Sequence, residues 1–288
     1  MPCSKLNDRM TLKTRRLSRF RADLHVHTAL SPCASDEMTP PAIVRTAMAK
    51  GLDIIAVCDH NSAGNVEAVQ VAARQQAVQV AAHQQALQAA ARQQAAQSDG
   101  ATLAVLCGME VTSAEEVHVL GLFPDLEAAH KVSDRIRGCL PPADQEYYSF
   151  FGRQSLLSAD GEEIGLESAS LAAAVPLPVD AVVSLIHGAG GLAIAAHVDR
   201  RSFSVYSQLG FFPRSAGFDA IEVSRRLRAE SELWKELRQL GLPVIRSSDS
   251  HFLDELGTAA TELYLCEPTF AELALAFAGL EERRVVHA

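Results

Sequence analysis

Short apolar runs alternate with helical patterns along most of the chain from Arg21 onward. The runs are rich in Val, Ile, Leu and Ala and have the length of strands, whereas the stretches between them have the spacing of helices. This order predicts βα units around a parallel sheet or barrel, in the α/β class. The expected strands are residues 22–27, 53–58, 102–108, 117–123, 192–197, 218–223, 243–247 and 261–265.

Helix boundary signals support this division. Thr39 precedes Pro40 and Pro41, which is typical of a helix start. Thr269 and Glu272 have the spacing of a capping box for the last helix. Residues 138–178 fit neither period and predict an insertion over one barrel end, which serves as a lid, an oligomer contact or a plain surface excursion.

A nine-residue unit is repeated three times in residues 69–95, as VQVAARQQA, VQVAAHQQA and LQAAARQQA. Ala and Gln favour helix, so one long helix is expected from about residue 66 to 97. Nine residues make about two and a half turns, so successive copies face opposite sides and form no continuous apolar stripe. The repeat is interpreted as a lengthened barrel helix, with a self-association helix as the alternative.

Composition and charge narrow the class of protein. The 288 residues are 48% hydrophobic, with a net charge of −9 and a pI near 5.6, which argues against broad electrostatic binding to duplex nucleic acid. The cysteines have no paired spacing, and no run of about 18 apolar residues occurs, which predicts a cytoplasmic protein. Residues 1–20 are expected to be a disordered basic leader, with a nucleic-acid-binding arm as the alternative, and residues 21–288 a single domain.

Histidines and carboxylates gather where the expected strands end or, in one case, begin. His25 and His27 lie two apart at the end of the first strand, so their side chains face the same side. In an α/β barrel the loops at the C-terminal ends of the strands converge, so we expect all these residues to meet in one mouth. The others are Asp59, His60, Glu110, His118, His197, Asp249 and His251.

Two common hydrolytic and phosphate-binding motifs are absent from the sequence. There is no G-x-S-x-G nucleophile elbow and no P-loop ending in Gly-Lys-Ser/Thr. Mixed histidine and carboxylate ligands suit Zn, Mn or Fe, and they exceed what one tetrahedral ion can use. The set predicts a cluster of two or three divalent metal ions, with Mg as a further option.

With its ordered set HxH, DH, E, H, H and DxH, the chain resembles the polymerase and histidinol phosphatase (PHP) family of metal-dependent phosphoesterases, over residues 22–123 and 190–260. The resemblance implies a distorted (β/α)7 TIM-like barrel with a three-metal site at the C-terminal ends of the strands. The stretches EVHVLGL and AHVDR are most similar to the branch that acts on nucleotides and short oligonucleotides.

The same resemblance implies a role for each position. One metal would be held by His25, His27 and Asp249, a second by His118 and His197 with Glu110 as the bridge, and a third by His60 and His251. Asp59 would orient an imidazole. Arg200 matches a phosphate-binding arginine of this branch, with a surface salt bridge as the alternative.

The loop after the HxH pair departs from the family pattern. Relatives often have Ser-Asp-Gly there, whereas this chain reads TALSPCASDEMTP. Alignment back from Thr39 and Pro40 makes Asp36 the expected third-site ligand, and counting forward from His27 gives Cys33 instead. A thiolate suits Zn but matches Mn or Mg poorly, so Asp36 is the preferred prediction and Cys33 the alternative.

The activity implied is hydrolysis of a phosphomonoester by a metal-bound hydroxide in a di- or trinuclear site. Arg200 would neutralise the phosphoryl group, and His251 or a metal-bound water would protonate the leaving group. The expected substrate is a nucleotide or a short single-stranded oligonucleotide end, with histidinol phosphate as an alternative. A non-catalytic scaffold that binds a partner through the Ala/Gln-rich helix is the alternative from another class.

Overall fold

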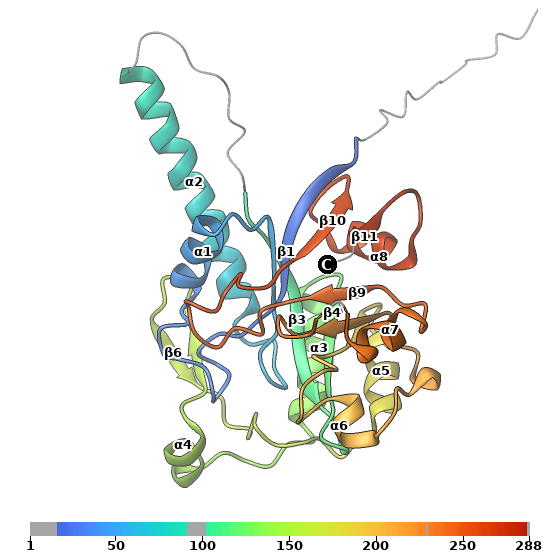
Figure 1. The fold of residues 1–288 in the computed structure, drawn as a ribbon. Coiled ribbons are helices and arrows are strands. Elements are labelled where there is room, and N and C mark those ends of the chain that lie inside the picture. Colours follow the sequence, from blue (N-terminus) through green and yellow to red (C-terminus); the bar gives the residue numbers. More distant parts are fainter. Residues whose placement is uncertain (1–15, 91–101, 229, 287–288) are drawn as a thin grey trace, which may run out of the picture.

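The computed structural model describes residues 16–90, 102–228 and 230–286 (Figure 1). Its main sheet has nine strands in the order β11-β10-β1-β2-β3-β4-β7-β8-β9. The strands are β1 (Ser18–Val26), β2 (Ile54–Val57), β3 (Ala104–Thr112), β4 (His118–Phe123), β7 (Leu192–Ala195), β8 (Ala220–Val223), β9 (Val244–Arg246), β10 (Thr261–Leu265) and β11 (Arg284–Val286). A separate hairpin joins β5 (Ser155–Leu157) to β6 (Glu163–Leu166).

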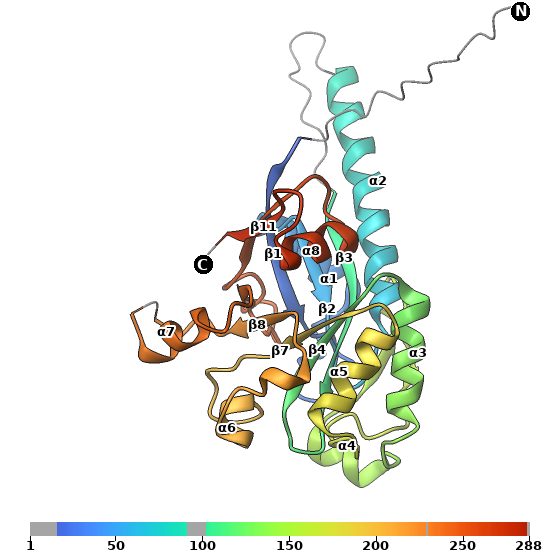
Figure 2. The same cartoon turned by 90° about the vertical axis from the view of Figure 1, so that its right-hand side faces the viewer.

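Helices cover the outside of this sheet, and Figure 2 shows α2, α3 and α5 along one side of it. They are α1 (Pro40–Ala49), α2 (Val66–Ala90), α3 (Leu126–Arg137), α4 (Gln145–Phe151), α5 (Val179–Gly188), α6 (Val205–Leu209), α7 (Glu232–Arg238) and α8 (Phe270–Ala278), with a short 3-10 helix at Arg214–Ala216. Within the described ranges, no helix combines the length and the apolar character needed to cross a membrane.

The strands from β1 to β9 curve into a nearly closed barrel. The last gap is bridged where the backbone N–H of His27 donates to the carbonyl of Ser250 at 3.0 Å, and Ser250 donates to His25 at 3.3 Å. The strand β4 runs antiparallel to both β3 and β7, whereas the other barrel neighbours are parallel. The expectation of a distorted α/β barrel is confirmed, and the antiparallel β4 is one source of the distortion.

Two apolar layers explain why the strands read as nearly continuous hydrophobic runs. The inner layer holds small and branched side chains from the barrel strands, including Leu24, Ala56 and Ile194. The outer layer packs residues such as Val57 under the helices. Strands buried on both faces need apolar residues at every position, which is the pattern the sequence shows.

The repeat helix and the segment predicted as an insertion are described in part by the structure. The first turns of α2 pack on the barrel through Val66 and Val69, and farther along Val78 is 69% exposed. The last expected helical residues, 91–97, lie outside the described part of the chain, as do residues 1–15 of the predicted leader. Residues 138–178 contain α4 and the β5-β6 hairpin, and Ser155 donates its backbone N–H to Ala29 in the loop after β1 at 3.0 Å.

Candidate functional site

A β-bulge delivers the two histidines of the HxH pair to the barrel mouth. The register between β1 and β2 shifts between Asp23 and Val26, so one extra residue is accommodated on β1. Leu24 belongs to the inner layer and Val26 to the outer one. The bulge therefore changes which positions face inward, and His25 and His27 come together with their Nε2 atoms 3.0 Å apart.

Glu110, near the end of β3, lies at the centre of the site. Its carboxylate is almost fully buried, at 1% exposure, and five imidazoles converge on it. The distances from Glu110 oxygens are 2.8 Å to His118 Nδ1, 2.9 Å to His60 Nδ1, 3.1 Å to His197 Nε2, 3.4 Å to His25 Nε2 and 3.5 Å to His27 Nε2. A buried carboxylate with this many imidazoles around it is a strong candidate for a bridging ligand.

Asp249, in the loop after β9, lies against both histidines of the HxH pair. Its Oδ1 lies 3.3 Å from His25 Nε2 and 3.1 Å from His27 Nε2. Its other oxygen, Oδ2, lies 2.5 Å from the guanidinium of Arg200, whose side chain is 42% exposed. Asp249 thus joins the buried ligands to a cation at the rim.

The described residues contain three groups whose ligand atoms all lie within 4.8 Å of one another: His25, His27, Glu110 and Asp249; His60, Glu110 and His118; and His27, His60 and His251. The first group matches the predicted first site with Glu110 added. In the second group His60 takes the place that the sequence analysis gave to His197. His197 lies outside the three groups and contacts Glu110 Oε1 instead.

The backbone at two of these residues is strained. His197 has φ of 27° and Asp249 has φ of 50°, in the left-handed region that side chains other than glycine seldom adopt. Such conformations cost on the order of 1–3 kcal/mol each and cluster at functional sites. Their presence at both residues indicates that the fold holds these side chains in place against local preference.

Glu222 is a functional residue that the sequence analysis missed. It lies in the centre of β8 with 1% exposure, and both of its oxygens lie 3.1 Å from His25 Nδ1. It also accepts the backbone N–H of His197 at 2.9 Å. Because Glu222 holds a proton on Nδ1 of His25, it leaves the Nε2 lone pair free to face the cluster. A carboxylate in the middle of the apolar run FDAIEV is the signal that could have identified it.

Asp59 orients His27 through a relay. Ser31 Oγ donates to Asp59 Oδ1 at 2.7 Å and lies 2.8 Å from His27 Nδ1. Since the one hydroxyl proton of Ser31 goes to Asp59, Ser31 accepts from His27 Nδ1–H, and His27 Nε2 carries a lone pair. The role expected for Asp59 is thus consistent with the geometry, with Ser31 as the intermediary.

The electrostatics divide the central groups into two kinds. Burial lowers the pKa of His25 and of His60, but the neighbouring carboxylates outweigh it, so the pKa of His25 lies well above its ordinary value and that of His60 is about 10. Burial raises the pKa of Glu110 and of Asp249, but the neighbouring imidazoles outweigh it and hold both pKa values well below the ordinary range. Burial lowers the pKa of His27 well below its ordinary value and that of His118 to about 4. Glu110, Asp249, His27 and His118 are thus already in the protonation state that binds a divalent cation, whereas a cation would have to displace protons from His25 and His60.

The unsatisfied atoms of the cluster fit a metal better than a hydrogen-bond network. Glu110 Oε2 is buried and has no hydrogen-bond partner among the described residues, although His60 Nδ1 is only 2.9 Å away. The Nε2 atoms of His25 and His27 face each other with their other nitrogens already engaged. Buried polar atoms without partners are costly, and a divalent cation would satisfy all of them.

The residues of the loop after β1 take different positions. Asp36 is exposed and belongs to none of the three ligand groups. Cys33 is also outside those groups, but its Sγ lies 3.3 Å from His60 Nε2. Burial raises the pKa of the Cys33 thiol, but hydrogen bonds with His251 and His60 outweigh it and lower the pKa to about 6.

Solved structures of similar fold come from several hydrolases. Endonuclease Q from Pyrococcus furiosus, a lesion-specific endonuclease, aligns with a TM-score of 0.62 and 18% identity over 93% of this chain and 58% of its own. A Bifidobacterium adolescentis protein described as a metal-dependent phosphoesterase aligns with a TM-score of 0.51 and 20% identity, over 80% of this chain and 87% of its own. An amidohydrolase from Chromobacterium violaceum aligns with a TM-score of 0.54 and 17% identity, over 89% and 96%.

Sequence comparison gives one curated relative and two family matches. The uncharacterized protein YqxK of Bacillus subtilis is 31% identical over 103 residues, which are 34% of this chain and 26% of that protein. The chain thus spans little more than half of endonuclease Q and about a quarter of YqxK. The PHP-associated family model matches residues 231–278, and the PHP domain model matches residues 23–208. The PHP domain match extends over more than half of the sequence, and the chain therefore belongs to the PHP domain family.

Proposed function

We propose that this protein is a metal-dependent phosphoesterase that hydrolyses a phosphomonoester, such as a nucleotide or the end of a short oligonucleotide. The observation that carries the proposal is the convergence of five imidazoles on the buried carboxylate of Glu110. The PHP domain match and the similarity in fold to a protein described as a metal-dependent phosphoesterase support the same reaction class.

The three ligand groups would hold two or three divalent ions, with Glu110 shared between two of them. Bound at this site, the ions would supply an activated water and positive charge for the phosphoryl oxygens. The protein contributes the rest: Glu222 and Ser31 orient the imidazoles, and the bulge in β1 aims them.

Arg200 is our candidate for binding the substrate phosphate. Its guanidinium contacts Asp249 Oδ2, on the side of that carboxylate away from the two histidines. A partly exposed arginine can turn toward an incoming phosphate and bind it with two parallel hydrogen bonds. His251, whose Nδ1 lies 3.1 Å from the carbonyl of Asp249, would be a ligand if three ions bind, and it is our candidate for protonating the leaving group if only two bind.

The ligand group of His27, His60 and His251 is called the outer group here. The contacts support Cys33 over Asp36 as a further ligand of this group. Only Cys33 touches an imidazole of this group, and a thiol with a pKa of about 6 is largely ionised at neutral pH. A thiolate ligand favours Zn over Mg in that position.

Zinc titrations of two variants separate these alternatives. Cys33→Ser is expected to weaken zinc binding and Asp36→Asn to leave it unchanged, measured by competition with a chelating dye. The reverse result would assign the site to Asp36.

The reaction class is tested by phosphate release after reconstitution with Mn²⁺, Zn²⁺ or Fe²⁺. The panel contains nucleoside monophosphates, 5′-phosphorylated short oligonucleotides and histidinol phosphate. We expect release that a chelator abolishes and that His25→Ala lowers by about 1000-fold or more. His130→Ala, an exposed histidine of α3, is the matched control. Absence of phosphate release across the panel, together with partner capture that depends on α2, would favour the scaffold function instead.

A second candidate is incision of damaged DNA. It is favoured by the similarity to endonuclease Q, one structure of which contains a 27-mer duplex with an abasic lesion. The net charge of −9 argues against it, because duplex binding relies on a basic face. A labelled duplex with an abasic site, added to the panel, would be cut only if this candidate is correct.

A further inference from the structure

A cleft of about 560 Å³ opens directly beside the proposed metal centre. The cleft lies at the loops that follow β7, β8 and β9. Asp249 lines its wall and also belongs to the ligand group that contains His25, His27 and Glu110. The charged residues that line it are Arg200, Arg201, Arg225, Arg226, Asp199, Asp249 and Glu255. Four arginines thus contribute to the wall of one cleft next to the proposed metal centre.

The carboxylates of the cleft are engaged in holding its walls. Asp199 accepts the backbone N–H of Ser224 at 2.7 Å and its hydroxyl at 2.6 Å, which ties the loop after β7 to the loop after β8. Glu255 accepts the backbone N–H of His251 at 3.1 Å. Arg246 supports the same loop from below by donating to the carbonyls of Ser224 and Leu227.

The arginines away from Asp249 are not engaged in this way. Arg201, Arg225 and Arg226 are exposed. Among the described residues, the guanidinium groups of Arg201 and Arg226 make no hydrogen bond or ion pair, and that of Arg225 donates to Thr258 Oγ1 at 3.2 Å. Like charges on a rigid wall repel one another unless an anion lies between them. The fixed backbone and the free guanidinium groups describe a site for an anion from outside the chain.

We propose that Arg201, Arg225 and Arg226 bind a second phosphate of the substrate whose scissile phosphate lies at Arg200 and the metal centre. The inference rests on the proposed phosphoesterase function and specifies its substrate class, a molecule with two phosphate groups. Guanidinium groups recognise phosphate through paired, charge-assisted hydrogen bonds, which the neutral ribose or base of a monophosphate cannot replace.

The test compares substrates with one and with two phosphates. Metal-loaded wild-type protein and the double variant Arg201→Gln, Arg226→Gln are assayed on a nucleoside 5′-monophosphate, a nucleoside 3′,5′-bisphosphate and a 5′-phosphorylated dinucleotide. We expect the double variant to lose about 30-fold in kcat/KM on at least one doubly charged substrate and less than about twofold on the monophosphate. The substrate that shows the loss identifies whether the second phosphate is a terminal group or a diester.

Controls make the result specific to the cleft. The double variant Arg45→Gln, Arg135→Gln removes the same charge from exposed positions of α1 and α3 and should behave as wild type. If the wild-type protein hydrolyses the substrates, equal losses on all three, or no loss on any, would overturn the inference.

Equilibrium binding of the bisphosphate, measured in parallel, separates the two proposals. If no substrate is hydrolysed but binding still weakens about 30-fold in the Arg201→Gln, Arg226→Gln protein, the phosphoesterase function is wrong and the anion site stands. If the substrates are hydrolysed and binding is unchanged, the second-phosphate site is wrong.

Discussion

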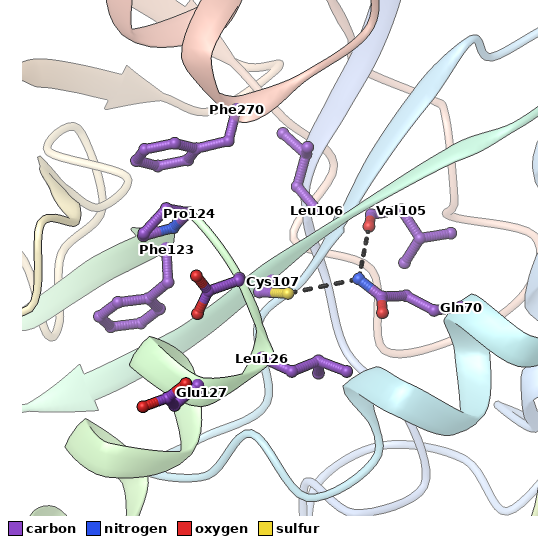
Figure 3. A pocket seen from close by; sticks show the side chains of 10 residues that line it. Gln70, Val105, Leu106, Cys107, Phe123, Pro124, Leu126, Glu127 and Phe270 are labelled. Atoms are coloured by element: carbon purple, nitrogen blue, oxygen red, sulfur yellow. Dashed lines mark hydrogen bonds between the residues drawn. The ribbon is translucent and has the colours of Figure 1, made fainter.

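The two ends of the barrel differ in whether their polar side chains have hydrogen-bond partners. At the N-terminal end, a cavity of about 500 Å³ is lined mainly by apolar side chains such as Phe123, Leu126 and Phe270 (Figure 3). Among its polar side chains, the half-buried Gln70 is satisfied locally, because Nε2 donates to the carbonyl of Val105 at 3.0 Å and to Cys107 Sγ at 3.3 Å. At the C-terminal end, Glu110 Oε2 and His197 Nδ1 are buried without hydrogen-bond partners among the described residues.

This difference separates packing from chemistry. In a barrel, the N-terminal face contributes mainly to stability, whereas the loops at the C-terminal face carry the active site. The buried atoms without hydrogen-bond partners, and the strained backbone of His197 and Asp249, lie at the C-terminal end. The C-terminal end therefore has buried atoms that a ligand would satisfy, and changes at the two ends should have different consequences.

The largest expected effect is that of Asp249→Asn. The amide keeps the shape of the side chain but removes the charge that His25, His27 and Arg200 all contact. We expect kcat/KM for phosphate release to fall by about 1000-fold or more. Asp254→Asn, an exposed neighbour on the same loop, should retain activity within about twofold. Full activity of Asp249→Asn would mean that the cluster is not the reaction centre.

Glu222→Gln is expected to act more weakly, because Glu222 positions a ligand without being one. Loss of the carboxylate that orients His25 should weaken metal binding by about 10–100-fold, measured by titration with a metal-sensitive dye. Glu127→Gln, at the N-terminal cavity, is the matched control and should bind metal as wild type does. Unchanged metal affinity in Glu222→Gln would show that Glu222 is not needed to orient His25 for metal binding.

Two cysteines at opposite ends provide a pH test. Burial raises the pKa of Cys107 to about 11, whereas hydrogen bonds with His251 and His60 overcome burial and lower that of Cys33 to about 6. Because the Cys33 pKa is lowered, its thiolate persists down to about pH 6 and is lost below it. At pH 6 in metal-free protein, Cys33 should react with iodoacetamide about 20-fold faster than an unperturbed thiol, whereas Cys107 should not react.

Peptide mass spectrometry reads out both cysteines in one sample. Added zinc should protect Cys33 if the thiol is a ligand. Labelling of Cys33 that follows an ordinary thiol titration, or that zinc does not slow, would contradict its place in the outer group.

The smallest expected effect is that of Gln70→Leu. The change removes two hydrogen bonds at the N-terminal cavity and should lower the free energy of unfolding by about 1 kcal/mol, measured by urea denaturation. Metal content and turnover should stay the same. Loss of turnover in this variant would show that the two ends are coupled and that the N-terminal end contributes to more than stability.

The sequence predicted most of the strands and the convergence of histidines, for a definite physical reason. Strands buried on both faces leave continuous apolar runs, and a polar residue directly after such a run has to lie at a strand end. The sequence analysis did not identify Glu222 as a site residue, because it lies within the short run AIEV and not after it. Its contact with His25 depends on a strand that is far away in the chain.

The loop after β1 and the arginine cleft were harder to predict, for related reasons. Either Cys33 or Asp36 can be aligned because loop length is not constrained by periodicity, and only the folded loop places Sγ beside His60. Arg201 and Arg226 come from loops after two different strands, so their proximity follows from the parallel pairing of β7 and β8. The sequence alone gave no spacing that joins them.

The central claim is that the C-terminal end of the barrel is a divalent metal centre built around Glu110. Metal content per chain, measured by elemental analysis after reconstitution and gel filtration, tests it most directly in wild type, Glu110→Gln and Gln70→Leu. We expect two or three ions in wild type and in Gln70→Leu, and a loss of at least one ion in Glu110→Gln. Wild-type protein that retains no metal, or Glu110→Gln protein with the full complement, would contradict it.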